Sequence, residues 1–201
     1  MLNLTFLGCE LFNQKLVNLP EGLLNLTLGY NFNQKLENLP NSLQNLTFGC
    51  SFNQKLENLP NSLQNLTLGD YFNQKLENLP NSLQNLTLGQ NFNQKLENLP
   101  NSLQNLTLGY CFNQKRENLP SSIRNLTFGY HFKQKLNLCV ALPKLQKLTL
   151  NINYKLEVPL LFNTTIIYVS RHQINKKIYE RPEKYNINKW KNIFYKSINI
   201  K

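Results

Sequence analysis

The sequence predicts a repeat solenoid, leucine-rich-repeat-like, in which each unit of about 20 residues supplies one short strand of a parallel β-sheet. Seven phenylalanines recur at a constant spacing without drift, at Phe12, Phe32, Phe52, Phe72, Phe92, Phe112 and Phe132. In addition, the block at 52–69 recurs almost letter for letter at 72–89 and 92–109. A fixed period of this length indicates stacked structural units that share one core. We therefore expect a single array and not several independent domains.

The strand of each unit is predicted from its leucines. Leu63, Leu66 and Leu68 form the pattern L-x-x-L-x-L, which is the strand signature of leucine-rich repeats. On an extended strand, Leu66 and Leu68 point inward while Asn65 and Thr67 point outward. The predicted strands lie near residues 3–6, 25–28, 45–48, 65–68, 85–88, 105–108, 125–128, 147–150 and 164–169.

The rest of the unit returns the chain to the next strand. Gly69 is expected to end the strand and permit a turn, after which Phe72 re-enters the core. Pro80 belongs outside the sheet because it cannot donate a ladder hydrogen bond, and Asn81 and Ser82 suit the following bend. Since so short a unit leaves little room for a regular helix, we expect a mostly irregular or 3₁₀ return side.

Two columns of asparagine are expected to have structural roles. Amides stacked on neighbouring turns can hydrogen-bond to each other and to the turn backbone. The column after the core phenylalanine is Asn33, Asn53, Asn73, Asn93 and Asn113, and the column before Leu-Pro is Asn38, Asn58, Asn78, Asn98 and Asn118.

The array is expected to span residues 1–169 and to decay at its ends, where a terminal repeat has one neighbour only. The segment Ile152-Asn153-Tyr154-Lys155-Leu156-Glu157 resembles an eighth copy in which Ile152 replaces phenylalanine. Pro159 and Phe162 then match the Pro and Leu of earlier copies.

Residues 170–201 form a separate basic segment. Ile187, Trp190, Phe194 and Ile198 fall on one helical stripe and predict a helix that caps the last repeat. An alternative is that this basic helix binds an anionic membrane or a nucleic-acid backbone. Its candidate contact residues are Lys184, Lys189, Lys191 and Lys196.

The charge of the chain is concentrated at its C-terminal end. Residues 1–132 hold eight basic and eight acidic residues, whereas residues 133–201 hold 14 basic and three acidic ones, which accounts for the net charge of +11. A basic end can attract nucleic acid, anionic lipid or an acidic partner. Solubility and a lysine-rich composition would explain the same excess.

No catalytic site, cofactor or metal site is expected. The sequence has no Gly-rich phosphate loop and no nucleophile elbow, and its four cysteines and two histidines lack metal-ligand spacing. The repeated Glu and Lys positions predict surface charge ladders and not an acid/base pair. No apolar run reaches about 18 residues, so no transmembrane helix is expected. Without a signal peptide, we expect a cytoplasmic chain with reduced thiols.

The repeated block Phe-Asn-Gln-Lys-Leu-Glu-Asn-Leu-Pro-Asn-Ser-Leu-Gln-Asn-Leu-Thr-Leu-Gly resembles the FNIP repeat, a relative of leucine-rich repeats found in social amoebae and in giant viruses of amoebae. The likeness covers roughly residues 3 to 137, with lysine at the usual proline position after Phe-Asn-Gln (Lys35, Lys55, Lys75). Many viral relatives carry an N-terminal F-box that docks to a cullin-type ubiquitin ligase. Because this chain opens inside a repeat at Asn3, we expect no F-box here.

Two positions of the repeat vary while the rest of the unit is nearly fixed. Both follow the glycine that ends each predicted strand, at the rim of the expected concave face, where repeat proteins carry binding residues. Tyrosine is common there and is a favoured interface anchor, although drift at exposed loops would give the same variation. The candidate protein-binding residues are Tyr30, Asp70, Tyr71, Gln90, Tyr110, Tyr130 and His131.

The sequence thus favours a non-enzymatic monomeric scaffold that binds a host or viral protein whose identity it does not specify. One alternative, by family resemblance, is a substrate-recognition subunit associated with a cullin-type ubiquitin ligase. The other is a weak association with nucleic acid or anionic lipid through the basic C-terminal segment.

Overall fold

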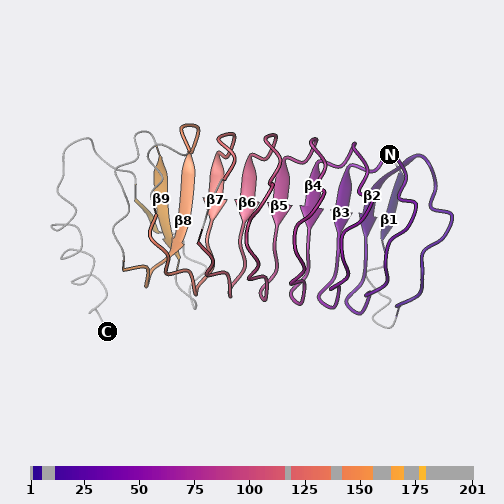
Figure 1. Ribbon diagram of the computed structural model, residues 1–201, viewed down its shortest axis with the longest axis horizontal. Coiled ribbons are helices and arrows are strands. Elements are labelled where there is room, and N and C mark those ends of the chain that lie inside the picture. Colours follow the sequence, from indigo (N-terminus) through magenta and orange to yellow (C-terminus); the bar gives the residue numbers. More distant parts are fainter. Residues whose placement is uncertain are drawn as a thin grey trace.

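The chain forms one extended sheet of stacked turns. The computed structural model describes residues 2–5, 12–115, 119–136, 142–155, 164–169 and 177–179. In these residues ten strands lie side by side in sequence order, and Figure 1 shows β1 to β9 as a row along the long axis. The strands are β1 (Leu2–Thr5), β2 (Leu23–Thr27), β3 (Asn45–Thr47), β4 (Asn65–Thr67), β5 (Asn85–Thr87), β6 (Asn105–Thr107), β7 (Asn125–Thr127), β8 (Lys147–Asn151), β9 (Thr165–Val169) and β10 (Lys177–Tyr179).

The repeat period sets the register of the sheet. Strands β1 to β9 pair in parallel, and equivalent residues face each other, as Leu46 faces Leu66 and Leu66 faces Leu86. All nine predicted strands are present, within one or two residues at their ends. The return segments contain turns, bends and irregular backbone, and the described residues include neither an α-helix nor a 3₁₀-helix. The described part of the chain accordingly contains no helix that could span a membrane.

The C-terminal segment supplies a strand that the sequence did not predict. Strand β10 pairs antiparallel with β9, so the sheet extends beyond the repeat array into residues 170–201. The predicted capping helix at 187–198 lies outside the described residues.

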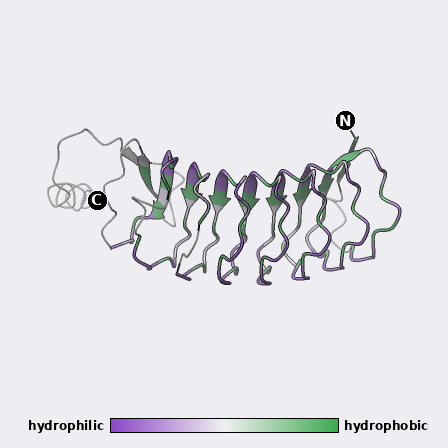
Figure 2. Ribbon diagram, turned by 45° about the horizontal axis from the view of Figure 1, so that its top comes forward, coloured by the Kyte–Doolittle hydropathy of each residue, from purple (hydrophilic) through white to green (hydrophobic). Residues whose placement is uncertain are grey.

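The core is a column of rings flanked by leucines. Each phenylalanine of the repeated series stacks on its copy in the next turn, with ring centroids 6.1–6.4 Å apart and planes within 14°. Leu63, Leu66 and Leu68 are buried, whereas Asn65 and Thr67 are half-buried on the other face. Figure 2 shows the alternation of hydrophobic and hydrophilic residues along the strands. Burying each such side chain contributes about 1.5–3 kcal/mol, and only stacked neighbours complete that burial.

Tyr154, and not Ile152, continues the phenylalanine column. The Tyr154 ring lies 6.0 Å from the Phe132 ring with planes 12° apart, and its Oη donates to the carbonyl of Gln134 at 2.8 Å. The assignment of Ile152 to the phenylalanine position was therefore wrong. The register explains the shift, because Asn125 pairs with Lys147, whereas an unbroken period would pair it with Leu145. The suggested copies at Pro159 and Phe162 lie outside the described residues.

The glycine after each strand is required by close packing between turns. A Cβ built on Gly49, Gly69, Gly89, Gly109 or Gly129 would lie 1.8–2.2 Å from the carbonyl oxygen of the glycine one turn earlier. None of the described glycines has a positive φ. The expected reason, a turn that only glycine permits, is thus replaced by a steric one, since no side chain fits between the two backbones.

The outward-facing strand asparagines form a continuous amide ladder. The Nδ2 of each donates to the Oδ1 of its copy on the previous strand, from Asn25 to Asn3 through Asn125 to Asn105. On the preceding bend, the serine hydroxyl donates to the carbonyl of the buried leucine that precedes the strand of the previous turn, as from Ser82 to Leu63 at 2.7 Å. Thr164 makes the same contact with the carbonyl of Leu145 at 2.7 Å. These ladders fix the order and spacing of the turns.

The two predicted asparagine columns have different roles. The Oδ1 of Asn53 accepts the backbone N–H of Asn73 at 2.9 Å, and its copies do the same from Asn13 to Asn113, which confirms the expected turn contacts. The column before Leu-Pro instead adopts positive φ, between 52° and 55° at Asn18, Asn38, Asn58, Asn78 and Asn98. Asparagine is among the few residues other than glycine that adopt this conformation readily. Asn118 lies outside the described residues.

Candidate functional site

The two variable columns lie in the turn that directly follows each strand. There the second variable residue donates its backbone N–H to the carbonyl of the first variable residue one turn earlier, at 2.8–3.0 Å. Examples are Tyr71 to Cys50 and His131 to Tyr110. Because both partners in these bonds are backbone groups, the side chains of the two columns can change without loss of this ladder.

Three of the seven candidate residues come together in an aromatic cluster, which comprises Tyr110, Tyr130 and His131. The two tyrosine rings stack 5.2 Å apart with planes 6° apart. The His131 ring stands edge-on to both, with centroids at 4.7 Å from Tyr110 and 5.4 Å from Tyr130. The tyrosines are half-buried and the histidine is exposed. The cluster is therefore a packed aromatic surface at the turns after β6 and β7.

Asn153 completes this surface from the next turn. Its Nδ2 donates to the Tyr130 hydroxyl at 3.3 Å, and its backbone N–H is held by the Oδ1 of Asn151 at 2.8 Å. Sequence reasoning missed Asn153 because the eighth copy was aligned two residues out of register. Once Tyr154 is placed under Phe132, Asn153 falls in the same column as His131.

The remaining candidates do not join the cluster. Tyr30 and Tyr71 are each 53% exposed. Asp70 contacts its column neighbours, because its Oδ2 accepts from the Cys50 thiol at 3.7 Å and its Oδ1 from the backbone N–H of Gln90 at 3.4 Å. Gln90 itself is exposed. The basic candidates Lys184, Lys189, Lys191 and Lys196 lie outside the described residues.

The contact between Cys50 and Asp70 affects thiol chemistry. Partial burial raises the pKa of the Cys50 thiol, and the negative charge of Asp70 and the hydrogen bond to it raise the pKa further. A raised pKa lowers the fraction of reactive thiolate, so this cysteine is not an activated nucleophile. Within the described part of the chain, no three His, Cys, Asp or Glu residues lie close enough together to hold a metal ion.

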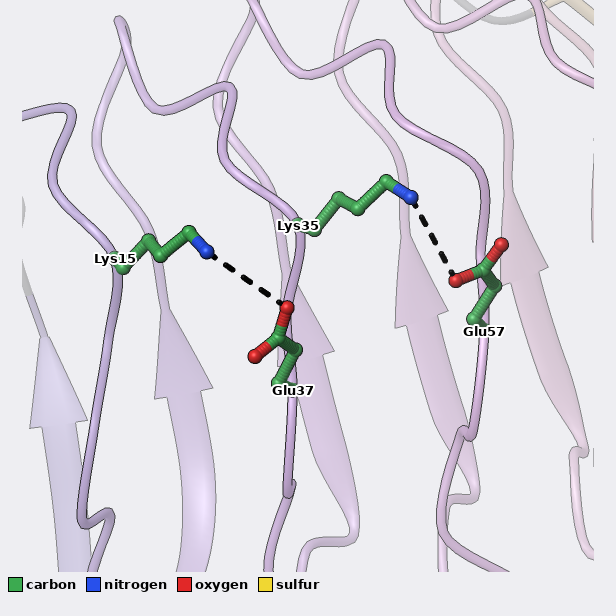
Figure 3. A network of polar contacts seen from close by, with 4 residues as sticks. All are labelled: Lys15, Lys35, Glu37 and Glu57. Carbon is green, nitrogen blue, oxygen red and sulfur yellow. Dashed lines mark ion pairs between the residues drawn. The ribbon is translucent and has the colours of Figure 1, made fainter.

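The repeated lysines and glutamates form diagonal ion pairs on the return side. Lys15 Nζ lies 3.9 Å from Glu37, and Lys35 Nζ lies 3.9 Å from Glu57, so that each pair joins one turn to the next (Figure 3). All four side chains are more than half exposed. Such pairs contribute little to stability, and they confirm the predicted surface charge ladder at these two steps.

Comparison with known proteins agrees with this architecture. The family model described as FNIP Repeat matches residues 12–51, 52–91, 77–111 and 112–152. Among solved structures, CroV588, described as a novel circular LRR protein, is 49% identical with a TM-score of 0.68. The match covers 72% of this chain and 23% of CroV588, so this chain spans about a quarter of that protein. No curated protein matches significantly.

Proposed function

Because this chain belongs to the FNIP-repeat family, we propose that it is a non-enzymatic scaffold that binds a protein partner through the aromatic cluster of Tyr110, Tyr130 and His131. The repeat array supplies a rigid row of turns, and the variable turn residues supply the chemistry. Leucine-rich-repeat-like scaffolds offer extended surfaces of this kind for association.

The observation that carries this proposal is the packing of three rings at positions where the fold requires no particular side chain. Elsewhere in the two columns the residues are small or polar, or they are single tyrosines such as Tyr30 and Tyr71. Large rings that are already ordered lose little conformational entropy on binding and present both apolar area and polar tips. The turns after β6 and β7 are therefore better suited to bind a partner than the other turns of the rim.

A capture experiment with two double variants tests the proposal. The 201-residue chain is immobilised and used to capture partners from amoeba cytosol, with mass spectrometry as the readout. Tyr110→Ser with Tyr130→Ser should lose the specific partner, with affinity reduced about tenfold or more. Tyr30→Ser with Tyr71→Ser removes the same number of tyrosines at other turns and should retain it.

As a control, both double variants must have the same midpoint temperature of thermal unfolding as the native protein. If the cluster variant folds normally and still captures the same partner at native level, the aromatic cluster is not the binding surface. Recovery of a cullin-ligase adaptor as the cluster-dependent partner would identify the ubiquitin pathway as the setting.

A further inference from the structure

The lysine column on the return side loses its glutamates toward the C-terminal end. Lys15 and Lys35 each pair with a glutamate of the following turn. For Lys115, the equivalent position of the following turn is Asn137. From residue 119 to residue 155 the sequence contains six basic residues and no acid. The diagonal charge balance of the early turns is therefore absent from the last ones.

Two further lysines are added in the same turns. Lys133 and Lys155 directly follow Phe132 and Tyr154, whose rings stack 6.0 Å apart, so both lysines occupy the same position of adjacent turns. Lys115, Lys133, Lys135 and Lys155 are all exposed. Ion pairs among the described residues occur at Lys15 and Lys35 only, so what sets Lys115 apart from the lysines at 55, 75 and 95 is that its diagonal position carries asparagine instead of glutamate. We call these four residues the lysine group.

The change to lysine at position 133 ends a structural ladder. Every earlier turn has asparagine there from Asn13 to Asn113, and its Oδ1 accepts the backbone N–H one turn ahead. A lysine ammonium has no acceptor, so Lys133 cannot extend this ladder to Lys155. A cation thus replaces a stabilising contact two residues after His131.

The lysine group and the aromatic cluster lie on the same turns. His131 precedes Lys133 by two residues, and Asn153, which contacts Tyr130, precedes Lys155 by two residues. We propose that the lysine group and the aromatic cluster together bind an acidic segment of a protein partner. This inference rests on the proposed function and adds the chemistry of the partner. Its carboxylates would form ion pairs with the lysines and accept hydrogen bonds from the tyrosine hydroxyls.

The packing of the rings favours an acidic peptide over a nucleic-acid strand. Proteins that bind single strands without sequence preference use open ring faces as platforms for the bases. Here one face of the Tyr110 ring packs against one face of the Tyr130 ring, and the His131 ring stands edge-on to both. A strand would therefore rely on phosphate contacts with a few lysines, whereas carboxylates need only charge and hydrogen-bond donors.

The test uses two triple variants of the full chain that lose the same charge. Lys133→Gln, Lys135→Gln and Lys155→Gln remove three members of the lysine group, and Lys55→Gln, Lys75→Gln and Lys95→Gln remove three lysines of the glutamate-balanced turns. Binding of a fluorescent Glu- and Asp-rich peptide is measured by anisotropy. A Gln- and Asn-substituted peptide and a single-stranded oligouridylate serve as comparison probes.

We expect the acidic peptide to bind the native protein. Its affinity should fall as the salt concentration rises, because the charges are exposed. The first triple variant should lose about tenfold in affinity and the second should stay within about twofold. Equal losses in both variants, no binding of the peptide, or tighter binding of the oligouridylate would overturn the inference. If the peptide fails while the Tyr110 and Tyr130 variant still loses its captured partner, the proposed function stands and only the acidic chemistry is wrong.

Discussion

The carbonyl oxygen of Gly89 lies where a side chain on Gly109 would begin. A Cβ built on Gly109 falls 1.8 Å from that oxygen and 2.5 Å from the Gly89 carbonyl carbon. Both contacts are far shorter than van der Waals distance, and both atoms belong to backbone that the parallel sheet holds in place. The turns after the strands are therefore as close as two backbones can pack, and the variable residues begin directly beyond this contact.

Gly109→Ala should strongly destabilise the array. The turns would have to separate locally, which disrupts the hydrogen-bond ladder and the core on both sides, so we expect a loss of about 3 kcal/mol or more. Gly22→Ala is the matched control, because a Cβ there meets nothing within 4 Å. Its stability should match or slightly exceed that of the native protein. Urea and thermal unfolding followed by circular dichroism measure both, and equal midpoints would contradict the steric account.

Asn65→Ala should break the amide ladder at its centre. Asn65 donates to Asn45 and accepts from Asn85, so its loss leaves two half-buried amides with one fewer partner, at a cost of about 1–2 kcal/mol. Asn125→Ala should cost less, because Asn125 donates to Asn105 while Lys147, not another asparagine, follows it in register. Unfolding midpoints compare the stability of the two variants. A larger loss of stability for Asn125→Ala than for Asn65→Ala would contradict the proposed role of the amide ladder.

Asn78→Gly should be tolerated and Asn78→Ala should not. The φ of Asn78 is 55°, in the left-handed region where alanine costs about 1–2 kcal/mol and glycine is unstrained. Asn81→Ala, at an exposed turn position outside that region, serves as the control. The same unfolding measurements apply. If the Asn78→Ala protein is as stable as the Asn78→Gly protein, the native asparagine is required for its side chain and not for its backbone conformation.

Asp70→Asn should speed alkylation of Cys50. The pKa of the Cys50 thiol is raised first by burial and then by the Asp70 charge, so native Cys50 has less thiolate at pH 8 than an ordinary cysteine. Removing the charge lowers the pKa, and the rate with iodoacetamide should rise about twofold to threefold at that pH. Peptide mass spectrometry follows Cys50 and Cys111 separately, and Cys111 should not respond. An unchanged Cys50 rate would show that Asp70 does not control the thiol.

The sequence was sufficient for strands β2 to β7 because the leucines from Leu26 to Leu126 and the phenylalanines from Phe12 to Phe132 repeat without insertion, so the period alone defines the register there. It could not reveal why Gly109 is glycine, since the distance between turns is not visible in a single unit. For the asparagine before Leu-Pro, the sequence predicts a structural role correctly but attributes it to side-chain hydrogen bonds. A repeated asparagine is expected both for such bonds and for a positive φ, so the sequence does not distinguish the two at Asn78.

The candidate site was only partly predictable. Tyr110 and Tyr130 share a column one turn apart, so their contact follows from the period. The contribution of Asn153 depends on the two-residue insertion that brings Lys147, and not Leu145, into register with Asn125, and the alignment by phenylalanine spacing overlooked it. Strand β10 lies beyond the repeat, and no periodic pattern marks it.

The most direct measurement of the central claim is site-specific photocrosslinking. Benzoylphenylalanine is placed at position 131 or at position 71, which are both exposed and occupy the same place in the repeat. Each protein is irradiated with the partner captured by the native chain. The account predicts an adduct with the partner at position 131 and none at position 71. Adducts at position 71 alone, at both positions in equal yield, or at neither would show that the partner does not bind at the aromatic cluster.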